Sequence, residues 1–245
     1  MKHLMVIFFV LYALQIKGQS LQLHYDARHA IDPENNPKNF VSVQFEYLKQ
    51  LDTGKTFIKP GTFLLKLQAD MSGDQSSIGK CYMQVSQEVR FWKPRIFINL
   101  QYSGGLGVTY PRQYSYYIQN TYQVGVSYPF KIGKGYFSSV LNYKYISYKK
   151  PSHDFFYTLY FYQGLWNYKV EFAGDFSFGT ENRNHGDEFT ASLHGKRFIF
   201  FAEPQLWYNI NKSLACGTRL NLYYHILSPD NRTQAYPTLG IRAKL

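Results

Sequence analysis

The stretch YKVEFAGDFSF at residues 168–178 alternates between two kinds of side chain. In an extended chain, one face carries Tyr168, Val170, Phe172, Gly174, Phe176 and Phe178, and the other carries Lys169, Glu171, Ala173, Asp175 and Ser177. This period of two predicts a β-strand. Ordinary strands have about 5–6 residues, whereas tilted membrane-spanning strands need about 9–11. The stretch therefore predicts a strand that crosses a membrane, with its apolar face toward lipid.

The same alternation recurs along almost the whole chain, and no segment keeps a helical period. Twelve strands are predicted, over residues 21–28, 40–51, 63–71, 80–91, 95–104, 116–128, 136–148, 154–163, 168–178, 198–210, 214–224 and 236–245. A soluble β-sandwich would also alternate, with its apolar face toward a core. The strand lengths and the aromatic content favour an all-β fold of another kind: a 12-stranded antiparallel up-and-down transmembrane β-barrel.

The register of each strand follows from the cost of charge in lipid. A Lys or Arg on the lipid face at mid-depth costs about 2–4 kcal/mol. The apolar face of each strand must therefore point outward and the charged face inward. In the last strand, for example, Leu239 and Ile241 should face lipid, whereas Arg242 and Lys244 should face the lumen.

The connections between the predicted strands alternate between long and short. The long ones cover residues 28–39, 106–115, 179–197 and 225–235, and the short ones include 91–94, 164–167 and 209–212. Outer-membrane barrels combine short periplasmic turns with longer outer loops. The long connections follow odd-numbered strands, as expected if both chain ends face the periplasm. Residues 52–62 are longer than a tight turn and could extend the paired strands.

Composition excludes several classes of protein. The 245 residues are 45% hydrophobic and 19% aromatic, with a mean hydropathy of −0.34. These values exclude a disordered chain and a polytopic helical membrane protein, and two cysteines exclude a disulfide scaffold. The formal net charge is +11, but Lys and Arg are scattered along the chain. We therefore expect no nucleic-acid partner, because nucleic-acid binders gather basic residues on one face.

The N-terminal segment has the regions of a secretory signal peptide. Lys2 and His3 form a basic start, residues 4–16 are mainly apolar, and Gly18 is a small residue before the predicted cut. The apolar region is too short to span a membrane comfortably. We therefore expect a signal peptide over residues 1–18 and the β-barrel over 19–245. Export and the barrel pattern together predict the outer membrane of a Gram-negative bacterium.

Several short stretches resemble a known family. They are LQLHYD at 21–26, EVRFWK at 88–93, YSGGLG at 102–107, AEPQLWYN at 202–209 and PTLGIRAKL at 237–245. In their order and spacing they resemble a family of Gram-negative outer-membrane barrels of unassigned function, allied to the nucleoside-specific Tsx-like channels. The resemblance implies a small monomeric barrel that passes or binds nucleoside-like solutes. The terminal Leu245 departs from the aromatic residue that often ends such barrels.

Inward-facing polar and aromatic side chains are the candidates for a solute path. Eight strands leave an interior filled by side chains and 16–18 leave an aqueous channel, so twelve strands should leave a narrow passage. Aromatic rings could stack a flat solute, and charged groups could contact solute or form internal ion pairs. The candidates are His24, Asp26, Glu88, Arg90, Tyr160, Tyr162, Lys169, Glu171, Glu203, Gln205, Trp207 and Arg219. The same inward faces carry Gln44, Glu46, Lys66, Asp175 and Arg242.

The leading functional hypothesis is a channel or binding pore for small polar solutes. A structural or surface barrel with a plugged lumen is the second hypothesis, and a barrel hydrolase acting on lipid is the third. The local motifs of serine hydrolases, zinc proteases and phosphate-binding loops do not occur. No catalytic residue, metal or cofactor is therefore predicted. The expected partners are outer-membrane lipid and lipopolysaccharide, the solutes and, during biogenesis, the barrel-assembly machinery, with the protein a monomer.

Two finer expectations test the register. In the strand over 198–210, the residues expected toward lipid are Phe198, Phe200, Ala202, Leu206 and Tyr208, and those expected toward the lumen are Glu203, Gln205, Trp207 and Asn209. Pro204 removes a ladder donor, so we expect a bulge or kink that turns Glu203 toward Lys169 or Arg219. Cys81 and Cys216 should lie near opposite rims and stay unpaired, since a disulfide needs Cα atoms within about 7 Å.

Overall fold

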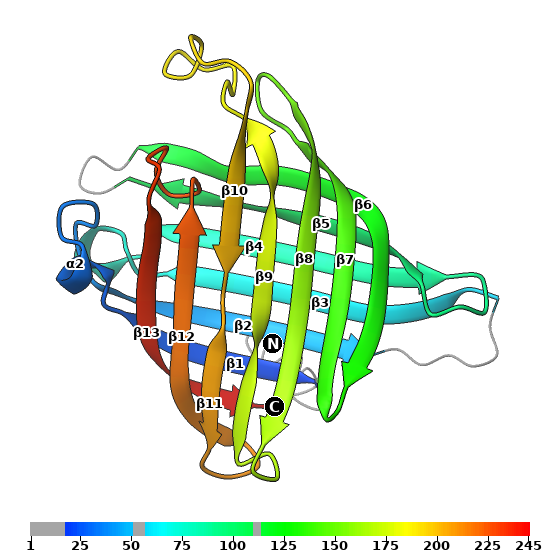
Figure 1. The fold of residues 1–245 in the computed structure, drawn as a ribbon. Helices are drawn as coiled ribbons and strands as arrows, with labels where there is room; N and C mark the ends of the chain where they lie inside the picture. The colour runs from blue at the N-terminus through cyan, green and yellow to red at the C-terminus, as the bar shows by residue number, and fades with distance from the viewer. Residues whose placement is uncertain (1–17, 51–56, 110–113) are drawn as a thin grey trace, which may run out of the picture.

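Strands that follow one another in sequence lie side by side, and the last strand returns to the first (Figure 1). The computed structural model describes residues 18–50, 57–109 and 114–245, so the predicted signal peptide lies outside the described residues except for Gly18. The strands are β1 Gln19–Asp26, β2 Phe40–Gln50, β3 Lys59–Asp70, β4 Lys80–Arg90, β5 Phe97–Val108, β6 Ser115–Ile132, β7 Gly135–Ile146, β8 Ser152–Leu165, β9 Val170–Asn182, β10 Lys196–Ala202, β11 Gln205–Asn209, β12 Leu214–Tyr224 and β13 Thr233–Lys244. Two short helices, α2 Arg28–Ile31 and the 3-10 helix Asp74–Ser76, lie in connections.

The described chain forms a closed antiparallel barrel whose wall has twelve strands. β10 and β11 together occupy one place in the wall, because both pair with β9 on one side and with β12 on the other. β1 pairs with β2 and also with β13, which closes the sheet. The predicted 12-stranded antiparallel barrel is confirmed.

The wall strand made of β10 and β11 is interrupted at Glu203 and Pro204. Ala202 and Gln205 are three residues apart in the chain, and so are their partners on β9, Phe176 and Ala173. The interrupted strand therefore contains no inserted residue. The Glu203 N–H still donates to the Asp175 carbonyl at 3.0 Å. The interruption that Pro204 predicted is therefore a kink that keeps the register, and not a bulge.

The two faces of the wall are inverted relative to a water-soluble protein. On β1, Leu23 and Tyr25 are 50% and 49% exposed, whereas His24 and Asp26 are 0% and 1% exposed. The polar residues point into the lumen and the apolar residues point outward. This is the arrangement that a lipid surrounding requires, and it confirms the predicted register.

Outward-facing rings form an aromatic belt near the long loops. Across β5 to β8, the ring centroids of Tyr102, Tyr122, Tyr145 and His153 follow one another at 5.2, 6.4 and 5.1 Å. Across β9, β10 and β12, the ring centroid of Phe198 lies 6.3 Å from that of Phe178 and 6.3 Å from that of Tyr224. Aromatic residues favour the membrane–water interface, so this belt marks one edge of the membrane.

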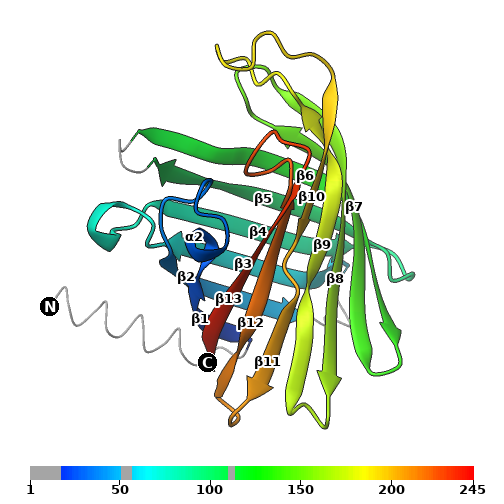
Figure 2. The ribbon, with the colours of Figure 1, turned by 60° about the vertical axis from the view of Figure 1, so that its left-hand side comes forward.

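The long and short connections lie at opposite ends of the barrel. α2 and the long loops gather at the end away from the C-terminus (Figure 2). Several strands run further toward this end than predicted; β9, for example, continues to Asn182. At the other end, β3 begins at Lys59, so it includes part of the connection predicted over residues 52–62. Among the described residues, no helix is long and apolar enough to cross a membrane.

Both cysteines lie on strands near opposite ends of the barrel. Cys81 follows the first residue of β4 at the long-loop end, and Cys216 lies near the short-turn end of β12. Both are exposed free thiols. Their predicted placement near opposite rims is confirmed, and that they stay unpaired in the oxidising compartment stays a prediction.

Candidate solute path

A cavity of about 1240 Å³ occupies the half of the lumen nearest the short turns. It begins at the rim, where Gly18, Gln50 and Lys131 line it, and it reaches inward to Lys66 and Asp175. Its wall combines charged groups with aromatic rings. The aromatic part of the wall contains Phe97, Phe130, Tyr136, Phe137, Tyr160, Phe161 and Tyr162. A cavity of this size and mixed lining can hold a small polar molecule.

The inner end of the cavity is crossed by an ion-pair bridge. Lys66 on β3 extends to the opposite wall, where its Nζ lies 3.0 Å from a Glu203 oxygen and 3.5 Å from an Asp175 oxygen. A second contact crosses the lumen between β4 and β8, where Gln84 donates to the Tyr160 hydroxyl at 3.1 Å. These contacts join walls that are not neighbours in the sheet, so they obstruct the lumen at this level.

Glu203 is also held from its own side of the barrel. An Arg219 guanidinium nitrogen lies 3.6 Å from Glu203 and donates to the Gln44 side-chain oxygen at 2.5 Å. The His24 Nδ1 lies 2.9 Å from the Thr238 hydroxyl oxygen, and this hydroxyl also donates to the Arg219 carbonyl. The kink therefore turns Glu203 into a polar layer in which its cations are Lys66 and Arg219.

A second cluster surrounds Glu171 nearer the short turns. Glu171 forms ion pairs with Arg242 and, at 2.5 Å, with Lys244, and it accepts a hydrogen bond from Asn209 at 2.8 Å. The Arg242 guanidinium lies 4.7 Å from the centroid of a Trp207 ring. These groups tie β9, β11 and β13 together, and they leave Glu171 with two cations.

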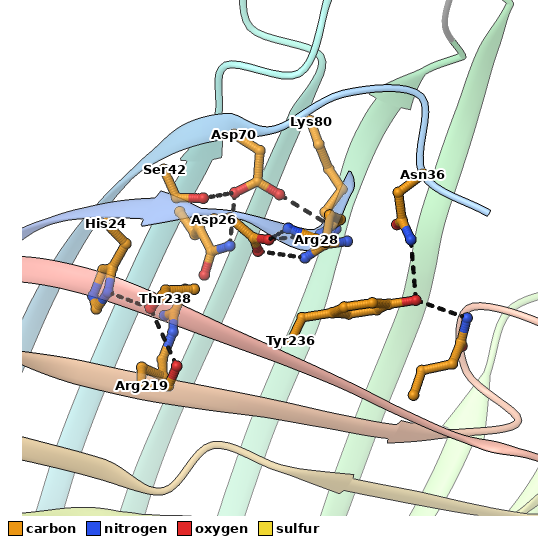
Figure 3. Close-up of polar contacts among 12 residues, drawn as sticks. His24, Asp26, Arg28, Asn36, Ser42, Asp70, Lys80, Arg219, Tyr236 and Thr238 are labelled. Atoms are coloured by element: carbon orange, nitrogen blue, oxygen red, sulfur yellow. Dashed lines mark hydrogen bonds and ion pairs between the residues drawn. The ribbon is translucent and has the colours of Figure 1, made fainter. Parts of the chain in front are cut away.

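The half of the lumen nearer the long loops holds a further polar network (Figure 3). Asp26 forms an ion pair with Arg28 at 2.7 Å, and the Arg28 guanidinium lies between the rings of Phe40 and Tyr236, at 4.8 and 4.9 Å. Asp70 accepts from the Ser42 hydroxyl at 2.7 Å. This half therefore holds internal ion pairs and hydrogen bonds where the other half holds a cavity.

Tyr236 fastens the first long loop over this network. Its hydroxyl donates to Asp32 at 2.8 Å and accepts from the side-chain amides of Asn36 and Gln234, both at 3.1 Å. Hydrogen bonds from Asn35 and Tyr236 lower the pKa of Asp32, which favours its charged form. Loop residues 27–39 are thus attached to β13 by Tyr236, and Asp32 also pairs at 3.5 Å with Arg232, the residue before β13.

Most of the predicted site residues lie in or beside the cavity. Those that line it are Glu88, Arg90, Tyr160, Tyr162, Glu171 and Gln205. Glu203, Arg219 and His24 form the polar layer at its inner end, and Trp207 is fully buried beside it. Asp26 lies further out. Lys169 was wrongly assigned to the lumen: it lies exposed in the turn before β9, with its Nζ 4.8 Å from the centroid of the outward Tyr208 ring.

The most important residues that the candidate list missed are Lys66 and Asp175. Alternation alone places both on inward faces, but it cannot show that β3 and β9 lie opposite each other. That relation appears only when the barrel closes. The sequence also gave no signal that Tyr236 would hold the loop over residues 27–39.

The histidines bear on the hydrolase hypothesis, which needs a serine within hydrogen-bond reach of a histidine. His24 contacts Gln22 and Thr238, and His29 contacts the carbonyl of Asn36. His153 contacts Tyr143, and His225 contacts the carbonyl of Phe198 and the side chain of Asn231. None of the partners of these four histidines is a serine.

Comparison with known proteins identifies the family. A family model described as a domain of unknown function, DUF5020, matches residues 18–244. The chain belongs to the DUF5020 family. No curated protein sequence matches it. Among solved structures, the DUF5020 barrel is similar to the NanC porin, with a TM-score of 0.54 and 10% identity over 93% of this chain and 100% of that one.

Two further structures are similar at a lower level. The KdgM porin has a TM-score of 0.46 and 8% identity, with 92% of this chain and 99% of that chain covered. Outer-membrane phospholipase A from Escherichia coli has a TM-score of 0.44 and 13% identity, with 93% and 96% covered. At 10% identity, the likeness to NanC shows the fold of an outer-membrane barrel and does not extend to the solute.

Proposed function

We propose that the DUF5020 barrel is an outer-membrane channel or binding pore for small polar solutes. The observation that carries the proposal is the cavity of about 1240 Å³ that begins at the short-turn rim. Short turns face the periplasm in outer-membrane barrels, so the cavity would open toward the periplasm. The chain would arrive there by export with a cleaved signal peptide.

Planar-bilayer recording tests this proposal. The purified protein should give discrete conductance steps, and its liposomes should swell in small sugars more quickly than protein-free liposomes. A silent bilayer together with no swelling would contradict a solute path.

Nucleosides are the narrower candidate within this proposal. Tyr160 and Tyr162 line the cavity, and the Tyr162 ring lies 6.5 Å from that of Tyr136 on the next strand. Stacking on an aromatic side chain contributes about 1–3 kcal/mol per base in nucleic-acid sites. Uridine should therefore reduce conductance, and Tyr162→Ala should weaken this effect, while ribose alone should have no effect.

A structural barrel with a plugged lumen is the alternative, and the Lys66 bridge favours it. If the bridge is permanent, the lumen is two blind halves and the bilayer stays silent although the protein is folded. The hydrolase hypothesis is tested separately, by release of fatty acid from phospholipid or lipopolysaccharide vesicles.

The outward surface supports a single barrel embedded in lipid. Apolar side chains are exposed on strands around the wall, including Leu23, Leu100, Val126 and Leu239, at 50, 47, 49 and 71%. We propose a monomer in contact with outer-membrane lipid and lipopolysaccharide, inserted by the barrel-assembly machinery. Light scattering of the detergent-solubilised protein, corrected for detergent, should give the mass of one chain.

A further inference from the structure

The carboxylates at the inner end of the cavity already hold an ammonium group. Lys66 Nζ sits between Glu203 at 3.0 Å and Asp175 at 3.5 Å, and these two side chains are 10% and 8% exposed. Asp175 lines the cavity beside Lys66, so an ammonium that arrives from the cavity side would reach Asp175 first, with Glu203 directly behind the Lys66 ammonium.

Lys66 has a third carboxylate within reach on its own side of the barrel. Glu46 on β2 is its direct cross-strand partner, and it lines the same cavity. Side chains paired in this way have Cβ atoms about 4.5–5.5 Å apart, which a lysine can bridge easily. Among the described residues, Glu46 takes part in no ion pair. Lys66 could therefore leave Glu203 and still hold a carboxylate.

The departure of Lys66 would affect its two present partners differently. Glu203 would keep Arg219 at 3.6 Å, whereas Asp175 has Lys66 as its cation in the described structure. A buried carboxylate left without a cation is costly, so Asp175 would require a replacement. The replacement must be a cation small enough to enter the cavity.

A further carboxylate without an ion pair lines the cavity nearer the rim, four residues along β4 from Gln84, the cross-strand partner of Lys66. Glu88 is 5% exposed and lines the cavity, and its carboxylate accepts a hydrogen bond from the Thr62 N–H at 2.9 Å. The ion pairs of the described residues give Glu88 no partner. Basic side chains, among them Lys59, Arg90 and Arg95, also line the cavity toward the rim, whereas Glu46 and Asp175 line it beside Lys66 at the inner end.

We infer that the inner end of the cavity binds the primary ammonium group of an organic solute, at Asp175 and Glu203 in place of Lys66. Lys66 then pairs with Glu46 along the wall. The inference rests on the proposed solute path and names the class of solute. The inference also explains how the obstruction could be removed. When the solute ammonium replaces Lys66 at the two carboxylates, Lys66 no longer crosses the lumen.

Calorimetric titration of the refolded barrel in detergent micelles tests this inference. Cadaverine is the probe, and the neutral pentanediol and the anionic glutarate are matched controls of the same chain length. Cadaverine should bind at one site, and neither control should bind. This comparison uses the unmodified chain, so it does not depend on the folding of any variant.

Variants locate the site. Asp175→Asn and Glu203→Gln should each weaken cadaverine binding at least about tenfold, and Lys66→Met, which removes the competing ammonium, should strengthen it about tenfold. Glu188→Gln, in an exposed outer loop, is the matched control and should bind as the unmodified chain does. Each variant is first shown to migrate as a folded barrel on an unboiled gel.

The possible results separate this inference from the proposed function. Absence of cadaverine binding, equal binding of pentanediol, preference for magnesium ions, or no loss in Asp175→Asn and Glu203→Gln would each overturn the inference. Conductance without cadaverine binding would support the proposed solute path and contradict the ammonium site. Cadaverine binding in a barrel that never conducts would support the ammonium site and contradict a passage through the lumen.

Discussion

Replacing Ala202 by arginine should hinder assembly of the barrel more than Glu203→Gln does at the neighbouring position. Ala202 faces outward on β10, is 0% exposed, and has Phe176 and Leu222 as its register partners on the two adjacent strands. An arginine there must displace these apolar side chains and place its charge toward lipid.

The structure gives the size of the effect. A basic residue on the lipid face costs about 2–4 kcal/mol at mid-depth. Overfilling a packed site adds about 1–3 kcal/mol. The free energy of unfolding should therefore fall by about 3–7 kcal/mol in Ala202→Arg, as the sum of these two terms.

Glu203→Gln is the matched control, because it changes the next residue along the strand, which faces the lumen. Removing one partner of a buried ion pair costs about 3–5 kcal/mol when the other is left alone. Here Lys66 keeps Asp175 and Arg219 keeps Gln44, so both cations retain a partner. The loss should stay below that range, and the barrel should still assemble.

Urea titration of each variant refolded into lipid vesicles measures the two effects, with gel migration of unboiled samples as the check of assembly. Ala202→Arg should be the less stable variant. If Ala202→Arg folds normally and Glu203→Gln does not, the inward and outward faces of this strand are reversed, because a slip of one residue exchanges the faces.

Three further outcomes are expected. Unboiled protein should migrate differently from boiled protein on a detergent gel, since a closed barrel has no free edge; identical migration would argue against closure. Mass spectrometry after alkylation should find Cys81 and Cys216 both modified, and an intramolecular disulfide would contradict the strand directions. Tyr236→Phe should speed proteolysis within the loop over residues 27–39. Because the pKa of Asp32 is lowered from 3.8 in the folded state, the attachment of this loop should persist at neutral pH and weaken as the pH falls below 3.8.

The fold could be predicted because its evidence is local. Alternation over residues 168–178 requires only neighbouring residues, and the cost of charge in lipid then decides which face is inward. The same reasoning correctly oriented Glu203 and Trp207. It failed at Lys169, because alternation continues into the turn before β9 and does not show where pairing stops.

The contacts across the lumen could not be predicted in the same way. The Lys66–Glu203 pair joins residues on opposite walls, and its existence depends on strand number, tilt and closure. The kink at Pro204 was predicted from the missing donor, but whether it inserts a residue depends on β9 and β12. The sequence therefore identified which groups face inward without showing which of them meet.

The pairing of β1 with β13 has a consequence for the order of folding. His24 and Thr238, which meet across this seam, are 214 residues apart in the chain. Contacts of such sequence separation form late, because the loop they close carries a large entropy cost. Until they form, β1 and β13 are unpaired edges that invite pairing with other chains. The protein is thus most prone to aggregate just before β13 pairs with β1, and a chaperone that covers these two edges would protect it best.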